Sequence, residues 1–179
     1  MTSGRDRQPG ALRSRRLFFA LWPDAALRDG LVQRRRPLEA RLPKRVPDHN
    51  LHLTVLFLGN QPGDWLEAIE DAADAIRSPS FELLLDRFGE FERARVVWLG
   101  GAAPEAGRGL AETLERSMRG LGLDFDRRPW VPHVTLFRKV DDGRNLPPVA
   151  ALRWPVREFS LIESIPSRPY QVLRTWWLD

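Results

Sequence analysis

Short apolar segments of strand length recur along this chain, and the segment at 81–86 alternates with polar residues in the way that strand residues do. This pattern predicts roughly seven strands. They lie at residues 17–21, 52–57, 81–86, 95–99, 131–139, 156–165 and 170–178. Gly59 and Asn60 are expected to close the second strand, residues 88–91 are expected to form a bend around a glycine, and residues 141–148 read as a polar loop.

Other apolar residues follow helical spacing. They predict helices at about 24–42, 64–77 and 104–121. Pro23 and Asp24 begin the first helix, and Pro37 inside it is expected to kink the helix or end it early. Gly122 ends the third helix. Strands and helices mixed in this order predict an α+β fold.

Two of the predicted strands repeat each other across half the length of the chain. Residues 52–57 read HLTVLF and residues 133–138 read HVTLFR, so two of the three histidines occupy equivalent places. A strand sends residues i and i+2 to the same face. Each segment therefore presents an imidazole beside a hydroxyl, in the pairs His52 with Thr54 and His133 with Thr135. Two such pairs facing one cleft would supply the groups for acid–base catalysis on a phosphate ester.

The two His strands lie in opposite halves of the sequence. This spacing predicts two lobes that are related by a pseudo-twofold axis around a central groove, a preferred place for a ligand. Residues 1–15 are rich in arginine, proline and glycine and are expected to form a disordered basic tail. Residues 16–179 are expected to form a single bilobal domain.

Composition narrows the possible functions. The chain has 179 residues and no cysteine, which excludes disulfides and thiolate chemistry and favours a reducing cytoplasm. No apolar run approaches the roughly 20 residues of a membrane span, and the N-terminus lacks the apolar segment of a signal peptide. The net charge is +4 and arginine dominates the cations, which suits an anionic substrate, although compositional drift toward arginine would give the same excess.

The paired His-x-Thr strands resemble the 2H phosphoesterase superfamily, which is defined by two such motifs. Within it the chain is similar to the RNA 2′,3′-cyclic phosphodiesterases, also called 2′-5′ RNA ligases. Four segments carry this resemblance: 16–21 in the first strand, 50–59 and 132–138 around the two histidines, and Ser164 with 170–173 in the closing hairpin. Together these motifs are specific, whereas each one alone is weak.

The resemblance implies two antiparallel sheets with the active site between them and the helices on the outer faces. It implies no metal and no organic cofactor. The reaction it implies opens a 2′,3′-cyclic phosphate at an RNA end and leaves a 2′-phosphomonoester. Reversal of the same steps would join such an end to a 5′-hydroxyl. The expected partner is RNA or an oligonucleotide with a cyclic phosphate end, with no membrane and no obligate protein partner, so a monomer is expected.

Further residues are candidates for substrate binding. The resemblance includes the arginine that follows the second motif, Arg138, which would neutralise charge on the phosphate. Strict alternation places Arg138 on the face opposite His133, so the strand must bulge or twist if Arg138 is to reach the phosphate. Otherwise Arg138 is a surface residue in a salt bridge. Phe19 or Trp130 could stack on a base, although plain packing in the core is the stronger expectation for both.

His49 departs from the family, which more often has an acidic or polar residue at this place. His49 and His52 form an H-x-x-H pair of the kind that can bind a metal. At a junction between loop and strand these side chains point to alternate faces, and a site would also need a third protein ligand. We therefore expect no metal here.

The family resemblance favours His52 as the general acid and His133 as the general base, and the sequence alone cannot assign them. An unperturbed pKa near 6.5 would let either imidazole take either role. Thr54 and Thr135 are expected to donate hydrogen bonds to the non-bridging phosphate oxygens. The alternatives are a non-catalytic RNA-binding module, or a related phosphodiesterase that acts on a small cyclic nucleotide or a 2′-5′ oligonucleotide.

Overall fold

The computed structural model describes residues 13–42, 44–126 and 128–179. In this part of the chain nine strands form. They are β1 (Arg15–Leu21), β2 (Leu53–Gln61), β3 (Phe81–Leu85), β4 (Arg87–Phe91), β5 (Val96–Gly100), β6 (His133–Arg138), β7 (Leu152–Val156), β8 (Glu158–Glu163) and β9 (Gln171–Trp177). Buried and exposed residues alternate clearly in β2, β3 and β7.

Three α-helices accompany the strands in the described residues: α1 (Ala25–Arg35), α2 (Leu66–Asp74) and α3 (Glu105–Gly120). Short 3₁₀ turns lie at η1 (Arg36–Leu38), η2 (Asp48–Asn50), η3 (Gly63–Trp65) and η4 (Glu92–Ala94). None of the helices within residues 13–42, 44–126 and 128–179 is long and apolar enough to cross a bilayer.

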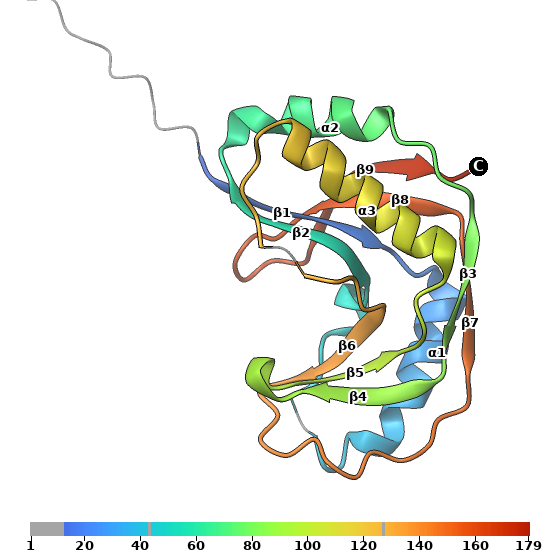
Figure 1. Cartoon of the computed structure of the whole chain (residues 1–179). Helices are drawn as coiled ribbons and strands as arrows, with labels where there is room; N and C mark the ends of the chain where they lie inside the picture. The colour runs from blue at the N-terminus through green and yellow to red at the C-terminus, as the bar shows by residue number, and fades with distance from the viewer. Residues whose placement is uncertain (1–12, 43, 127) are drawn as a thin grey trace, which may run out of the picture.

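The large sheet has two halves that scarcely touch. Its strand order is β4-β5-β6-β2-β1-β8-β9, and every neighbouring pair is antiparallel. The two His strands β2 and β6 meet at the centre through a single residue pair, Leu53 with Val134, so the halves can splay apart there. In Figure 1, β1 and β2 lie above β4, β5 and β6, and helices α2 and α3 cover the upper half on its outer side. The α+β class with antiparallel sheets is confirmed.

The bend that was predicted at residues 88–91 is wrong, because these residues belong to strand β4. Gly89 pairs with Trp98 on β5, and a side chain at position 89 would collide with the Trp98 ring. The glycine therefore makes room for a cross-strand indole, which is one of the established reasons for glycine inside a strand.

The strand that was predicted at residues 156–165 corresponds to β8, whereas the preceding strand β7 (Leu152–Val156) was not predicted. Strand β7 pairs with β3 in a separate two-stranded sheet, and β8 then joins the large sheet beside β1. Pro155 lies inside β7, where a proline argues against a central strand. In a two-stranded sheet both strands are edges, so the missing N–H of Pro155 can face away from β3.

The predictions for the first helix are confirmed at both ends. The Asp24 carboxylate accepts a hydrogen bond from the Leu27 N–H at 2.7 Å and so caps α1. The α-helix ends at Arg35, and the chain continues through η1, which contains Pro37. Strand β2 continues through Gly59 and Asn60 instead of ending there, because Gly59 takes a φ of +71° at a bulge in the pairing with β1.

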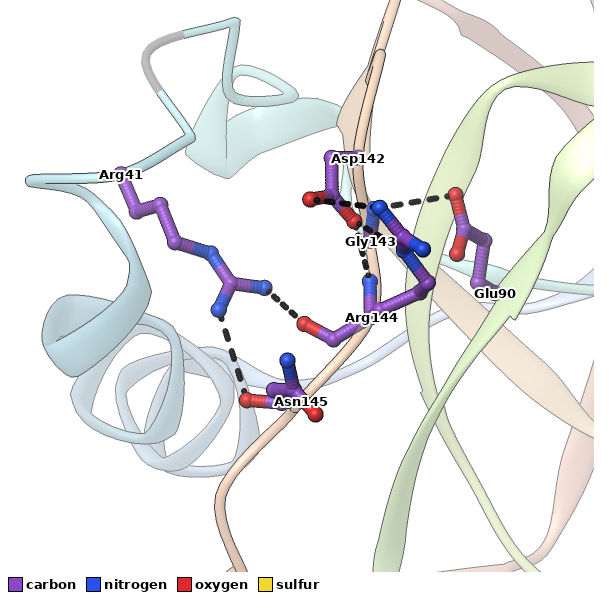
Figure 2. Close-up of polar contacts among 6 residues, drawn as sticks. All are labelled: Arg41, Glu90, Asp142, Gly143, Arg144 and Asn145. Carbon is purple, nitrogen blue, oxygen red and sulfur yellow. Dashed lines mark hydrogen bonds and ion pairs between the residues drawn. The ribbon is translucent and has the colours of Figure 1, made fainter.

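The polar loop after β6 is pinned on both sides (Figure 2). The Arg41 guanidinium donates to the carbonyls of Arg144 at 2.6 Å and Asn145 at 3.4 Å. The Gly143 N–H donates to the Glu90 carboxylate on β4 at 3.1 Å. These hydrogen bonds connect the loop both to strand β4 and to the segment that follows η1. They hold the chain in place directly after β6.

Residues 1–12 of the predicted tail lie outside the described residues. Arg13 and Ser14 are exposed, and Arg15 is the first residue of β1, one residue before the predicted start of the domain. The assignment of the rest of the chain to a single bilobal domain stays a prediction.

Candidate active site

A groove of about 1780 Å³ opens between the two halves of the large sheet. Both His-x-Thr motifs contribute to its lining, together with the arginine after the second motif. These residues are His52, Thr54, His133, Thr135 and Arg138. The fold therefore brings together the residues that the sequence singled out, because β2 and β6 run antiparallel at the centre of the sheet.

The two imidazoles are held in the same way. Nδ1 of His52 donates to the Asn50 carbonyl at 2.7 Å, and Nδ1 of His133 donates to the Val131 carbonyl at 2.7 Å. A carbonyl oxygen can only accept, so the proton of each neutral ring lies on Nδ1. Nε2 of each ring is then free to exchange a proton with a ligand in the groove.

Both histidines are neutral at pH 7 in the free protein. The pKa of His52 falls from 6.5 to about 4, mainly because the ring is buried; the bond to Asn50 acts in the opposite direction, and the positive charges of Arg138 and of protonated His133 add to the decrease. Burial and Arg138 also lower the pKa of His133, against the bond to Val131. The expectation of unperturbed imidazoles is therefore wrong for this state of the protein, because burial lowers the pKa of both rings.

Aromatic rings enclose His52 on three sides. Trp22 stacks on the imidazole with centroids 5.6 Å apart and planes 11° apart. Tyr170 meets the ring edge-on at 5.1 Å, and Phe18 contacts it at 5.1 Å. These neighbours remove water from the ring and account for its low pKa.

The surroundings of His133 are different. Phe91 meets its ring edge-on at 4.9 Å, and Trp98 lies 6.0 Å away. Sequence reasoning missed Trp22, Tyr170 and Phe91 as neighbours of the histidines. They come from three segments far apart in the chain, and no spacing in the sequence connects them to the motifs.

The two threonines lie half-buried in the groove wall. The indole N–H of Trp130 donates to the backbone carbonyl of Thr54 at 3.0 Å. Trp130 lies three residues before His133, so this bond joins the second motif to the first beside the single strand pair between β2 and β6.

A bulge in β6 places Arg138 in the groove. Val97 pairs with Phe137, whereas the next residue of β5, Trp98, pairs with Thr135, so Leu136 is the extra residue. Leu136 and Phe137 are both buried, and Arg138 then shares the face of Thr135. The bulge that Arg138 required is present. Among the described residues its side chain has no ion-pair partner, which argues against the surface salt bridge.

Comparison with known proteins assigns the family. The family model described as the 2′-5′ RNA ligase superfamily matches residues 22–165. The chain belongs to the 2′-5′ RNA ligase superfamily. This confirms the resemblance found in the sequence.

The relatives of this chain that carry the name RNA 2′,3′-cyclic phosphodiesterase include proteins from Escherichia coli and Thermus thermophilus. The protein from Escherichia coli (strain K12) is 37% identical over 172 residues, which cover 91% of this chain and 96% of that protein. The protein from Thermus thermophilus is 35% identical over 167 residues, covering 83% of this chain and 81% of that protein. The crystal structure of E. coli LigT complexed with 3′-AMP superposes with a TM-score of 0.83 at 35% identity, covering 93% of this chain and 99% of that one.

One predicted ligand contact in this superfamily member is wrong. Phe19 is fully buried and packs on Phe159 and Trp176 at 6.1 and 6.0 Å between ring centroids. A ring with no exposed surface cannot stack on a base. Its neighbour Phe18 points to the opposite face of β1 and lines the groove, as the alternation of a strand requires.

His49 is exposed on the turn η2 and does not belong to the lining of the groove. Within residues 13–42, 44–126 and 128–179 no group of three or more His, Cys, Asp or Glu side chains is placed to hold a metal ion. The Nδ1 of His52 is engaged with the Asn50 carbonyl and is therefore not available as a metal ligand.

Proposed function

We propose that this protein hydrolyses RNA 2′,3′-cyclic phosphate ends to 2′-phosphomonoesters, with His52 and His133 as its acid–base pair. The observation that carries the proposal is the equivalence of the two imidazoles. Each is oriented by the carbonyl two residues earlier, which leaves Nε2 of both rings available to the groove. The names of the relatives with 37% and 35% identity support the same reaction.

The proposed step is an in-line displacement at phosphorus. Nε2 of His133 takes a proton from a water molecule as its oxygen bonds to phosphorus. The bond from phosphorus to the ribose O3′ breaks, and protonated His52 gives its proton to that oxygen. The product keeps the phosphate on O2′. The choice of His52 as acid and His133 as base follows the family resemblance.

The other groove residues stabilise the charge that builds up on the phosphate. Thr54 and Thr135 donate hydrogen bonds to the non-bridging oxygens, and Arg138 supplies a positive charge that no carboxylate of the described chain neutralises. A fixed cation and hydroxyl donors are useful here because they need no reorganisation during the step.

The low pKa of His52 requires a source for its proton. An anionic phosphate beside the imidazole favours the charged form and raises its pKa, so the substrate itself promotes protonation of the acid. Arg138 acts in the opposite direction on the empty site, because it lowers the pKa of both histidines. The negative charge of a bound phosphate compensates the positive charge of Arg138, so His52 is protonated mainly when substrate is present.

The test is a panel of substrates with variants of the three histidines. The panel contains RNAs with 2′,3′-cyclic phosphate ends, 2′-5′-linked oligonucleotides and cyclic mononucleotides. His52→Ala and His133→Ala should each lower turnover by about 100-fold or more. The double variant should lose far less than the product of the two effects, because each group needs the other.

His49→Ala is the matched control, since His49 is an exposed imidazole outside the groove lining. It should retain wild-type turnover. Near-normal turnover in His52→Ala or in His133→Ala would refute the assignment. Binding of RNA without any turnover by the wild type would favour the non-catalytic binding module.

We also infer from the sequence that the protein works as a monomer in the cytoplasm. The absence of cysteine suits a reducing compartment. Sedimentation and cell fractionation would test the two statements separately.

A further inference from the structure

The groove is larger than the proposed reaction needs. Small-molecule sites usually enclose about 300–1,000 Å³, whereas this groove measures about 1780 Å³. Beyond the two histidines it continues along the first half of β1 and the second half of β2. Its lining at that end includes Arg13, Ser14, Arg16, Phe57 and Asn60.

A continuous row of side chains leads from His52 into this extension. Phe18 contacts the His52 ring at 5.1 Å and is stacked on Phe57 at 6.5 Å with planes 29° apart. Phe18 and Phe57 are paired across β1 and β2. The Arg16 guanidinium lies over the Phe57 ring, 4.9 Å from its centroid. Arg16 and Phe18 share one face of β1, roughly 7 Å apart along the strand.

The end of this row is open to a ligand. Phe57 is one of the exposed large apolar side chains, at 40% of its full accessibility. Arg16 is also exposed, and in the described part of the chain it has no carboxylate partner. Its neighbour Arg15 is different, because a Glu163 oxygen lies 2.6 Å from its guanidinium. Arg16 therefore offers a positive charge without a carboxylate partner in the described residues, and Phe57 beside it offers a partly exposed aromatic ring.

A nucleotide matches both features. A base can stack on a phenylalanine ring, and a guanidinium pairs with phosphate oxygens. We propose that Arg16 and Phe57 form a subsite for the nucleotide next to the cyclic-phosphate end, with its base on Phe57 and a backbone phosphate at Arg16. This inference rests on the proposed function and refines it, because it selects RNA ends over cyclic mononucleotides.

Turnover as a function of substrate length tests the subsite. The substrates are adenosine 2′,3′-cyclic phosphate and the ApA dinucleotide with the same end. For the wild type, kcat/KM should rise about tenfold or more from the mononucleotide to the dinucleotide, the effect of one stacked base. The ratio of the two values should fall to near one in Phe57→Leu and in Arg16→Met. Phe57→Leu keeps an apolar cover over Phe18 and removes only the aromatic face.

Arg36→Met is the matched control, because Arg36 is an exposed arginine on η1 outside the groove lining. It removes one positive charge and should keep the wild-type ratio. A wild-type ratio near one would overturn the subsite while leaving the proposed hydrolysis intact. A wild-type ratio retained in both Phe57→Leu and Arg16→Met would overturn its location.

Direct binding separates the subsite from the chemistry. The probe is a fluorescent single-stranded RNA tetranucleotide with a free 3′-hydroxyl, which cannot be hydrolysed by this reaction. Wild type and Arg36→Met should bind it several-fold more tightly than Arg16→Met and Phe57→Leu. If no cyclic phosphate were hydrolysed, the proposed function would fail, and this measurement would still support or overturn the subsite. Equal affinities in all four proteins would overturn it.

Discussion

His52 should make the protein less stable in acid, and the size of the effect follows from its surroundings. The folded protein holds this imidazole neutral with a pKa of about 4, below its ordinary value of 6.5. In the unfolded chain the ring is protonated first as the pH falls. The unfolded state then binds more protons than the folded state, so acid favours unfolding. The contribution of His52 is fully present above pH 6.5 and is lost as the pH falls toward 4.

The magnitude can be worked out from these two values. Between them the free energy of unfolding falls by at most about 1.4 kcal/mol per pH unit. From pH 7.5 to pH 4.5 the loss caused by His52 is about 2–3 kcal/mol. The pKa of His133 is also lowered, so protonation of His133 decreases the free energy of unfolding in the same direction. Other groups titrate in this range, so a comparison between variants is needed to isolate His52.

His52→Asn removes the titration and keeps an amide N–H that can donate to the Asn50 carbonyl. Urea unfolding at pH 4.5, 5.5, 6.5 and 7.5 gives the free energy of unfolding of each protein. Between the two extremes, the wild type should lose about 2–3 kcal/mol more than His52→Asn. His49→Asn replaces an exposed histidine and should lose as much as the wild type. Equal losses in the wild type and in His52→Asn would refute the burial argument.

Three further outcomes are expected. Thr54→Val and Thr135→Val should each lower kcat about tenfold, because two donors share the phosphate, and the pH–rate profile should keep both limbs. Prolonged EDTA treatment should leave turnover unchanged, whereas loss of activity that Zn²⁺ or Mn²⁺ restores would require a metal site. In a substrate with sulfur in place of the bridging O3′, the departing thiolate needs no proton from an acid. This substrate should therefore restore the activity of His52→Ala more than that of His133→Ala, and equal rescue would contradict the acid and base roles.

The sequence located the histidines and threonines because a period of two needs no tertiary information. It could not place Arg138 without the bulge at Leu136, and nothing in the HVTLFR segment signals a bulge. The error at Phe19 has a related cause. Residues 17–21 are apolar on both faces, since one face packs in the core and the other carries the Phe18 ring into the groove. An uninterrupted apolar run leaves the phase of the strand open.

The wrong bend at residues 88–91 shows a different limit. Glycine suggested a turn, but here its missing side chain accommodates the Trp98 ring on the neighbouring strand. Trp98 in turn lies 6.0 Å from His133. The reason for Gly89 is thus a contact between strands, and local propensity contains no information about it.

Two nearly identical motifs are thus given unequal surroundings by the rest of the chain. Their backbones treat His52 and His133 alike, with the same carbonyl bond at the same distance of 2.7 Å. Trp22 and Tyr170 enclose only His52, and they come from segments outside the repeat. A phosphodiester displacement needs one imidazole to give a proton and the other to take one. Symmetric strands alone would make the two rings interchangeable, so the division of their roles must come from the side chains around them.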